Sequence, residues 1–237
     1  MLTINETSFG LDPADIRIRD FRSDHLLVLD GAFTVDTAAP EYAGIRPMRL
    51  TVEDLPFAKS LPSTALVRAE VEGVHYATVT KVRITDARTL EIDKVLPYKA
   101  AGSYRVRLST MLIPERKTGA IVPHAKKTYS PEVLTGSVTG FAFSAVETGD
   151  WMMCALKADT LAFDGAAQAV ELRLPGLPED VSADEIPVFY NENLWGSYGS
   201  KCYAAGLEGG ILTIRRDGAA EEPEGTKAKF TRFLIVR

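Results

Sequence analysis

The side chains that most often bind metals or carry catalysis are widely spaced in this chain. Its three histidines, His25, His75 and His124, do not stand in the His-x-x-x-His or His-Glu-x-x-His spacing that places two imidazoles on one helical face. Carboxylates would therefore supply most ligands of any metal site. The sequence also lacks the glycine-rich motifs that hold nucleotide phosphates. We therefore expect no metal site and no cofactor.

Two common hydrolytic arrangements are not indicated either. The segment Gly196-Ser197-Tyr198-Gly199-Ser200 has only a superficial similarity to the Gly-x-Ser-x-Gly nucleophile elbow, because it lacks the strand-to-helix turn that exposes the serine. Carboxylate pairs such as Glu53-Asp54 and Asp184-Glu185 could serve a glycosidase, which needs two carboxyl groups about 5–10 Å apart. Any acidic chain contains such pairs, however, so the sequence favours a protein that is not an enzyme.

One segment, residues 188–199, combines aromatic rings with Asn and Gly. Flat rings give contact area at a low entropy cost, which is typical of surfaces that bind glycans or partner proteins. The alternative interpretation places Phe189 and Tyr198 in the core and Trp195 over its end. The matching stretch of the first half, residues 68–76, lacks this cluster, so only one half would bind. The candidate binding residues are Tyr190, Asn191, Asn193, Trp195 and Tyr198.

Basic residues also gather on predicted strand faces. Exposed basic residues of this kind usually keep strand edges from pairing and aggregating. They could instead face an acidic partner surface. The residues concerned are Arg105 and Arg107, Arg215 and Arg216, and Lys227 and Lys229.

Length and charge limit the class of protein. A chain of 237 residues is expected to form one or two domains. The net charge of -5, from 27 Lys+Arg against 32 Asp+Glu, argues against a nucleic-acid-binding protein, which would need a basic face. With 46% hydrophobic and 25% charged residues the composition is that of an average folded globular protein.

The start of the chain lacks the basic and apolar regions of a signal peptide. Its longest apolar stretches, such as Leu26-Leu27-Val28-Leu29, are far shorter than the roughly 20 residues that cross a bilayer. We therefore expect no signal peptide, no transmembrane segment and no membrane partner. In a reducing cytoplasm, Cys154 and Cys202 are expected to be buried thiols, and whether they touch is left open.

Alternation of apolar and polar residues dominates the chain and predicts strands, which offer one apolar face to a core. Short helices are predicted only at Val52 to Ser60 and at Pro178 to Ile186, where Ser182 and Glu185 match a capping box. Many short strands bounded by turn residues are typical of β-sandwiches and barrels. The predicted strands include 16–21, 77–84, 90–92, 104–109, 170–174 and 211–214.

The two halves of the chain show an internal similarity at a shift of 122 residues. Leu50 falls on Leu172, and Leu90-x-Ile92 falls on Leu212-x-Ile214. The expected elements keep the same order in both halves, which indicates tandem duplication. We therefore predict an all-β protein of two similar antiparallel β-sandwich modules, jelly-roll, immunoglobulin-like or barrel in topology, with one short helix each. The modules are residues 1–117 and 123–237, and residues 118–122 are the linker.

The closing strands of the second half, residues 186–189, 203–214 and 230–235, resemble those of β modules in tailed-bacteriophage virion proteins, and so does the matching stretch Thr89 to Ile113. The resemblance implies a virion protein of the capsid surface, collar or tail, made in the host cytoplasm. It implies symmetric assemblies, so other capsid or tail subunits and further copies of the chain are the expected partners.

Three hypotheses follow in order of preference. The first is a non-enzymatic virion structural protein, with capsid decoration or head attachment ahead of a tail-associated role. The second is a carbohydrate-binding or receptor-binding β-sandwich module, which rests on the aromatic segment. The third is an enzyme on a β scaffold whose active site cannot be seen in the sequence.

Overall fold

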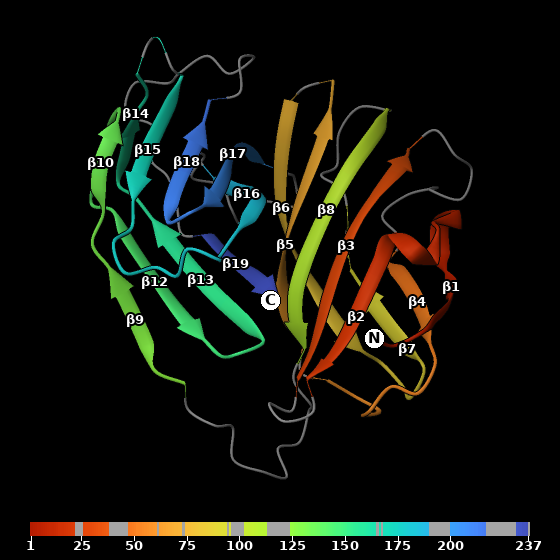
Figure 1. The fold of residues 1–237 in the computed structure, drawn as a ribbon. Coiled ribbons are helices and arrows are strands. Elements are labelled where there is room, and N and C mark those ends of the chain that lie inside the picture. Colours follow the sequence, from red (N-terminus) through yellow and green to blue (C-terminus); the bar gives the residue numbers. More distant parts are fainter. Residues whose placement is uncertain are drawn as a thin grey trace. The chain divides into compact units, whose positions relative to one another are not determined.

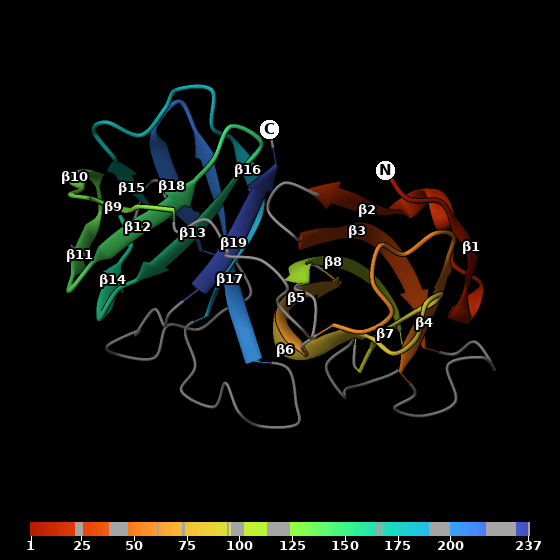
Figure 2. The same cartoon turned by 90° about the horizontal axis from the view of Figure 1, so that it is seen from below.

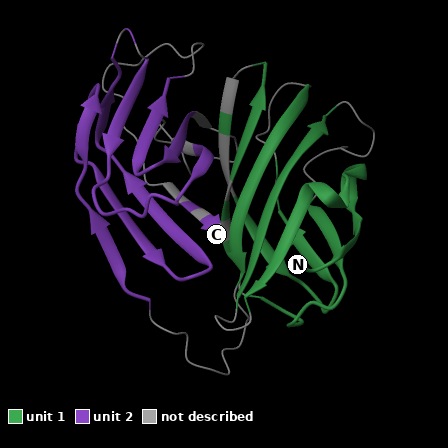
Figure 3. Cartoon of the chain, in the orientation of Figure 1, with its two compact units in different colours: residues 1–72, 76–123, 195–199 green, residues 73–75, 124–194, 200–237 purple. Residues whose placement is uncertain are grey.

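The structure is a computed structural model of the chain. It describes residues 1–21, 26–37, 47–60, 62–72, 74–93, 95, 102–112, 124–164, 166, 168–189, 200–216 and 231–236. The protein is all-β, with strands in antiparallel sheets and two single-turn 3-10 helices among the described residues. It divides into two compact units (Figure 3). Unit 1 comprises residues 1–72, 76–123 and 195–199, and unit 2 comprises residues 73–75, 124–194 and 200–237.

Unit 1 contains eight described strands, which are labelled in Figure 1. They are β1 (Ile4–Thr7), β2 (Ile16–Phe21), β3 (Leu26–Asp36), β4 (Met48–Val52), β5 (Ser63–Val71), β6 (Val74–Ile84), β7 (Thr89–Ile92) and β8 (Ser103–Leu112). The 3-10 helices Ser8–Gly10 and Pro13–Asp15 lie between β1 and β2.

The strands of unit 1 form one sheet that closes on itself. Hydrogen-bonded neighbours follow the order β1-β4-β7-β6-β5-β8-β3-β2. The N–H of Leu2 then donates to the carbonyl oxygen of Ile18 at 2.8 Å, and this bridge joins the chain just before β1 to β2. Figure 2 shows the strands arranged around the interior of the unit. In an immunoglobulin domain the second strand pairs with the fifth, whereas here β2 pairs with β3, so that topology does not describe unit 1.

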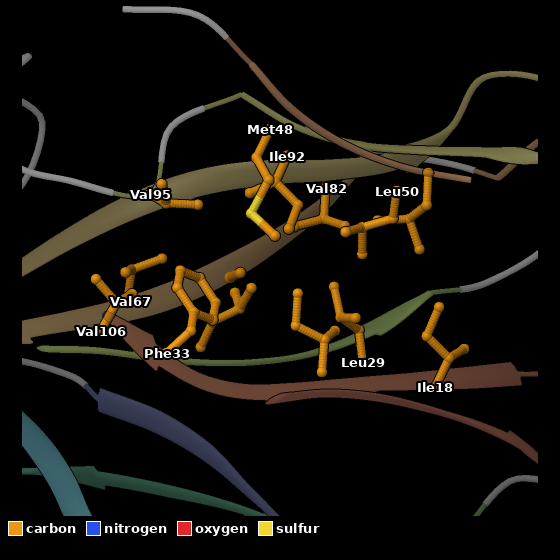
Figure 4. Packing of buried hydrophobic residues seen from close by; sticks show 14 of the residues in the cluster. Ile18, Leu29, Phe33, Met48, Leu50, Val67, Val82, Ile92, Val95 and Val106 are labelled. Carbon is orange, nitrogen blue, oxygen red and sulfur yellow. The ribbon is translucent and has the colours of Figure 1, made fainter. Parts of the chain in front are cut away.

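The interior of unit 1 is filled by the apolar face of each strand. In β8 the burial alternates residue by residue, with Tyr104 and Val106 inside and Arg105 and Arg107 outside. Figure 4 shows Met48, Leu50, Val82 and Ile92 pointing toward residues of the facing strands, among them Leu29 and Phe33. Period-2 alternation therefore places the apolar side of β8 inside, whereas the first four residues of β3, Leu26–Leu29, are buried on both sides of the strand.

Unit 2 contains eleven described strands. They are β9 (Lys126–Tyr129), β10 (Glu132–Thr135), β11 (Ser137–Thr139), β12 (Ala142–Glu147), β13 (Trp151–Lys157), β14 (Thr160–Ala162), β15 (Ala169–Arg173), β16 (Ala183–Phe189), β17 (Ser200–Glu208), β18 (Ile211–Arg215) and β19 (Thr231–Val236). One set of neighbours runs β10-β15-β18-β17-β16 and another runs β19-β13-β12-β9. A single hydrophobic cluster draws on both sets, and Cys154 is completely buried in it.

The same pairings occur in both units. In unit 1, β2–β3, β3–β8, β4–β7 and β6–β7 pair, and in unit 2, β12–β13, β13–β19, β15–β18 and β17–β18 pair. The first part of each unit also pairs with two strands in succession. In unit 1 it bridges to β2 and then pairs with β4, and in unit 2 β9 pairs with β12 before β10 pairs with β15.

The pairing of individual residues follows the shift seen in the sequence. Leu50 pairs with Leu90 in unit 1, and Leu172 pairs with Leu212 in unit 2, so a shift of 122 residues carries one pair onto the other. The predicted strands are confirmed, each within a residue or a few of its expected bounds. The predicted linker, residues 118–122, lies outside the described residues.

The two helix predictions are wrong. Val52 ends β4 and pairs with Ile4, and the following turn holds Asp54 at a φ of 54°, which a helix does not allow. In the second segment Ala183 begins β16, and Glu185 has a φ of 55° at an irregularity in its pairing with β17. Long-range strand pairing thus overrides the local capping-box signal. Within the described residues, no helix is long and apolar enough to span a membrane.

Candidate interaction surfaces

The aromatic loop expected to bind a ligand lies outside the described residues. This applies to all five candidates, Tyr190, Asn191, Asn193, Trp195 and Tyr198. Of the histidines, His25 lies outside the described residues, His75 lies in β6, and the ring of His124 meets Trp151 edge-on with 5.5 Å between ring centroids. No group of three or more potential metal ligands occurs in the part of the chain that the structure describes. The geometry that can be examined is therefore that of the outer strand faces.

The predicted basic face of β8 belongs to a larger surface of unit 1. Strand pairing places side chains of β5, β8, β3 and β2 side by side, because opposed residues point to the same side of a sheet. Arg107 lies opposite Arg68 of β5, and Arg17 of β2 lies opposite Asp30 of β3. We call this surface the arginine face. It contains Arg17, Arg19, Arg68, Arg105 and Arg107, with the carboxylates Asp30, Asp36 and Glu70.

Glu70 connects two arginines at the β5–β8 side of the arginine face. It forms an ion pair with Arg105, the residue opposite it, and lies 3.9 Å from the guanidinium of Arg68. Arg68 is only 4% exposed, whereas the side chain of Arg105 is 60% exposed. The arginine face thus combines a buried, fixed guanidinium with exposed ones that a partner can reach.

The balance of charge on this surface differs from that of the whole chain. Five arginines face three carboxylates here, although the chain carries a net charge of -5. Guanidinium groups form paired hydrogen bonds with carboxylates and phosphates. The arginine face is therefore suited to contact with an acidic surface of a partner.

A second charged cluster of unit 1 lies on the outer side of β4, β7 and β6. Glu91 of β7 is opposite Arg49 of β4 and Arg83 of β6. The Arg49 Nε donates to one carboxylate oxygen at 3.1 Å, and the Arg83 Nη2 donates to the other at 2.5 Å. Asp93 lies 3.4 Å from Arg83. We call these four residues the Glu91 cluster.

The Glu91 cluster stabilises the sheet and is not arranged for proton transfer. Burial raises the pKa of Glu91, but the hydrogen bonds from Arg83 and Arg49 outweigh burial, so the pKa lies below its usual range. Both carboxylate oxygens already accept hydrogen bonds, so Glu91 stays ionised and occupied. A general acid or base would instead need an accessible proton and a pKa near the working pH.

Sequence reasoning found part of this geometry. The alternation in residues 104–109 identified Arg105 and Arg107 as sharing one face, and the burial pattern confirms it. The same alternation occurs in Ile16-Arg17-Ile18-Arg19 and could have pointed to Arg17 and Arg19. The Glu91 cluster was not found, because Arg49, Arg83 and Glu91 lie on three different strands and meet only through pairing.

Comparison with known proteins gives no relative. No protein-family model, curated protein or solved structure matches the chain.

Proposed function

We propose that the chain is a non-enzymatic structural protein of a tailed-bacteriophage virion, which acts through protein–protein contacts in capsid decoration, head attachment or a tail-associated position. Its two units are proposed to be tandem β modules derived by duplication, and the closed sheet of unit 1 favours the barrel among the topologies that the sequence left open. The observation that carries the proposal is that four strand pairings of unit 1 have counterparts in the same order in unit 2. Repeated all-β bodies of this kind are suited to build assemblies through their surfaces.

The distribution of side chains supports a function on the outside of the molecule. Apolar residues fill the interior clusters of both units. The described charged side chains of the arginine face and of the Glu91 cluster lie on outer strand faces. The closing strands that resemble virion modules form β7, β8 and β16 to β19, and among them β7 and β8 of unit 1 correspond by their pairing to β18 and β19 of unit 2.

The proposal is tested by asking whether the chain is a component of particles. Tailed particles purified from the phage or lysogen that encodes it should contain the chain in many copies, as measured by quantitative mass spectrometry and immunogold labelling. Its gene should stand beside genes for portal, capsid or tail proteins. Recovery of the chain only in the soluble fraction of the lysate, with none on particles, would contradict the proposal.

The arginine face gives a second readout of the same proposal. Replacing Arg105 and Arg107 by Glu reverses the exposed charge on this face, and we expect the variant to bind particles lacking the chain at least tenfold more weakly. Lys81, which is exposed on β6, provides the matched control as Lys81→Glu. Equal binding by both variants would exclude the arginine face as the contact.

The aromatic segment of residues 188–199 favours one other candidate, a carbohydrate-binding or receptor-binding module. This function predicts binding to at least one glycan on an array and loss of that binding in Trp195→Ala. The absence of any array signal, or binding that Trp195→Ala leaves unchanged, would remove its support.

A further inference from the structure

The strand β10 presents apolar side chains to solvent at the edge of a sheet. Val133 is 48% exposed and Leu134 is 41% exposed, and Met1 is the other large hydrophobic residue that is exposed among the described ones. β10 pairs with β15 on one side, and no described strand pairs with it on the other. It lies at the left margin of Figure 1. Such an edge offers unpaired N–H and C=O groups to another strand.

The length of this edge is set by the residues that flank it. Pro131 precedes β10 and has no N–H to donate. Gly136 follows β10 with a φ of +72°, and a Cβ at this position would lie 2.7 Å from the carbonyl oxygen of Ala162. The pairing edge is therefore limited to the four residues Glu132–Thr135.

In unit 1, the position equivalent to Val133 carries a polar residue. Thr7 pairs with Leu50, and Val133 pairs with Leu172, the residue equivalent to Leu50. Val133 is therefore the counterpart of Thr7. The next pair of unit 2 is Thr135 with Glu171, so Leu134 is an extra residue at an irregularity between the two pairs.

The two hydroxyl groups of unit 1 serve contacts within the unit. Thr7 Oγ1 donates to the carbonyl oxygen of Leu11 at 2.5 Å, and Ser8 Oγ accepts from the N–H of Arg49 at 2.8 Å. In unit 2 the counterpart of Thr7 is Val133, which is apolar and exposed, and the exposed Leu134 follows it at the irregularity. The position of Thr7, whose hydroxyl group is bonded within unit 1, thus carries in unit 2 an apolar side chain that favours burial against a partner.

We propose that β10 is a self-association edge, on which the β10 strand of a second copy of the chain pairs in antiparallel orientation. Opposed residues of an antiparallel pair lie on the same side of the sheet, so a two-fold axis perpendicular to the sheet must pass through a residue that faces itself. Centred on Val133, the pairing places Glu132 opposite Leu134. Centred on Leu134, it places Glu132 opposite Gly136. Neither pairing opposes like charges, so the edge is self-complementary.

Four paired residues bury a small area compared with a stable dimer interface. The isolated protein is therefore expected to dimerise weakly and in a concentration-dependent manner, and repeated copies in a particle would strengthen the contact. This inference deepens the proposed function by naming one contact of the assembly. Self-association of purified protein is measured without any virion component, so it can fail or succeed independently of particle association.

The test compares three proteins by sedimentation velocity over a wide concentration range. The wild-type chain should form a dimer at the upper concentrations. Leu134→Glu places a negative charge opposite Glu132 in the pairing centred on Val133 and opposite itself in the pairing centred on Leu134, so it should weaken dimerisation at least tenfold in either case. Thr128→Glu, on strand β9 and also exposed, introduces the same charge outside the β10 edge and should dimerise as the wild type does. Circular dichroism checks that both variants fold.

Chemical cross-linking locates the contact. With a short bis-maleimide, Val133→Cys or Leu134→Cys should yield a covalent homodimer, whereas Thr128→Cys and the wild-type chain should not. Three outcomes would overturn the proposal: a wild-type chain that is monomeric at every concentration, a dimer that Leu134→Glu leaves unchanged, or equal weakening by Leu134→Glu and Thr128→Glu.

Discussion

At the scale of single residues, the charged side chains of unit 1 differ in how completely neighbouring residues bind them and shield them from solvent. Glu91 has both carboxylate oxygens occupied by arginines and is almost covered, with 9% of its side chain exposed. Glu70 is paired as well, but its partner Arg105 is 60% exposed. The first arrangement serves stability, and the second leaves charge available to a partner.

Removing the charge of Glu91 should destabilise unit 1. In Glu91→Gln an amide replaces an ionised acceptor between two guanidinium groups, and we expect a loss of about 1–2 kcal/mol, since the arginines themselves are partly solvated. Chemical denaturation measures it. Glu208→Gln, an exposed carboxylate in β17, is the control and should leave the midpoint nearly unchanged. Equal midpoints for all three proteins would show that the Glu91 cluster does not stabilise the fold.

The same carboxylate makes stability depend on pH in a defined direction. The pKa of Glu91 is lower in the folded chain than in the unfolded one, so its contribution is fully present above the unfolded value, which is about 4.3, and is lost as pH falls through the folded value. Denaturation from pH 7 down into the acid range should therefore show a steeper loss of stability for the wild type than for Glu91→Gln. Parallel profiles would contradict this.

At the scale of elements, sequence reasoning predicted strands correctly where apolar and polar residues alternate. It failed where long-range strand pairing determines the local structure. The strand at Ile16–Phe21 has its predicted bounds, and burial alternates over its first three residues, with Ile16 and Ile18 buried and Arg17 exposed. The segment Ser182–Glu185 carries a helix signal, yet its Ala183 pairs with Leu207 of β17 and Glu185 lies at the irregularity that follows. β10 was not predicted, because Glu132-Val133-Leu134-Thr135 has two adjacent apolar residues and no alternation. The exposure of β10 follows from its pairing with β15, which the sequence does not show.

Glycines at strand ends provide a test at this scale. Gly136 and Gly176 both have positive φ, but a Cβ meets backbone oxygens at Gly136 and nothing within 4 Å at Gly176. Gly176→Ala should cost about 1 kcal/mol for the backbone conformation alone. Gly136→Ala should cost about 2 kcal/mol or more, because two carbonyl oxygens must also move.

Thermal or chemical denaturation compares these two variants with Gly149→Ala, which has neither constraint and should stay close to the wild type. If Gly136→Ala were no less stable than Gly176→Ala, the close approach of β10 to the chain around Ala162 would be wrong.

At the scale of the whole molecule, each unit has its own hydrophobic cluster. The internal similarity at a shift of 122 residues predicted equivalent positions, and Leu50–Leu90 and Leu172–Leu212 form equivalent pairs. What the sequence did not reveal is the closed order of pairing, since Leu2 and Ile18, or β3 and β8, meet only in three dimensions. The binding loop at 190–198 stays a prediction.

The equivalent leucines give a matched test of separate cores. Leu50 and Leu172 are both completely buried, and replacing either by Ala should cost about 2–5 kcal/mol. Hydrogen exchange measured by mass spectrometry should show faster exchange within unit 1 for Leu50→Ala and within unit 2 for Leu172→Ala. Faster exchange throughout both units in either variant would indicate a single cooperative core.

The pairing of β3 with β8 has a consequence for how the protein is made. Leu27 pairs with Leu112, so β3 cannot complete its pairing until the ribosome has synthesised β8. During that interval the apolar run Leu26-Leu27-Val28-Leu29 has no eighth strand beside it. A nascent chain stalled before residue 103 should therefore recruit chaperones, and one extended past residue 112 should release them.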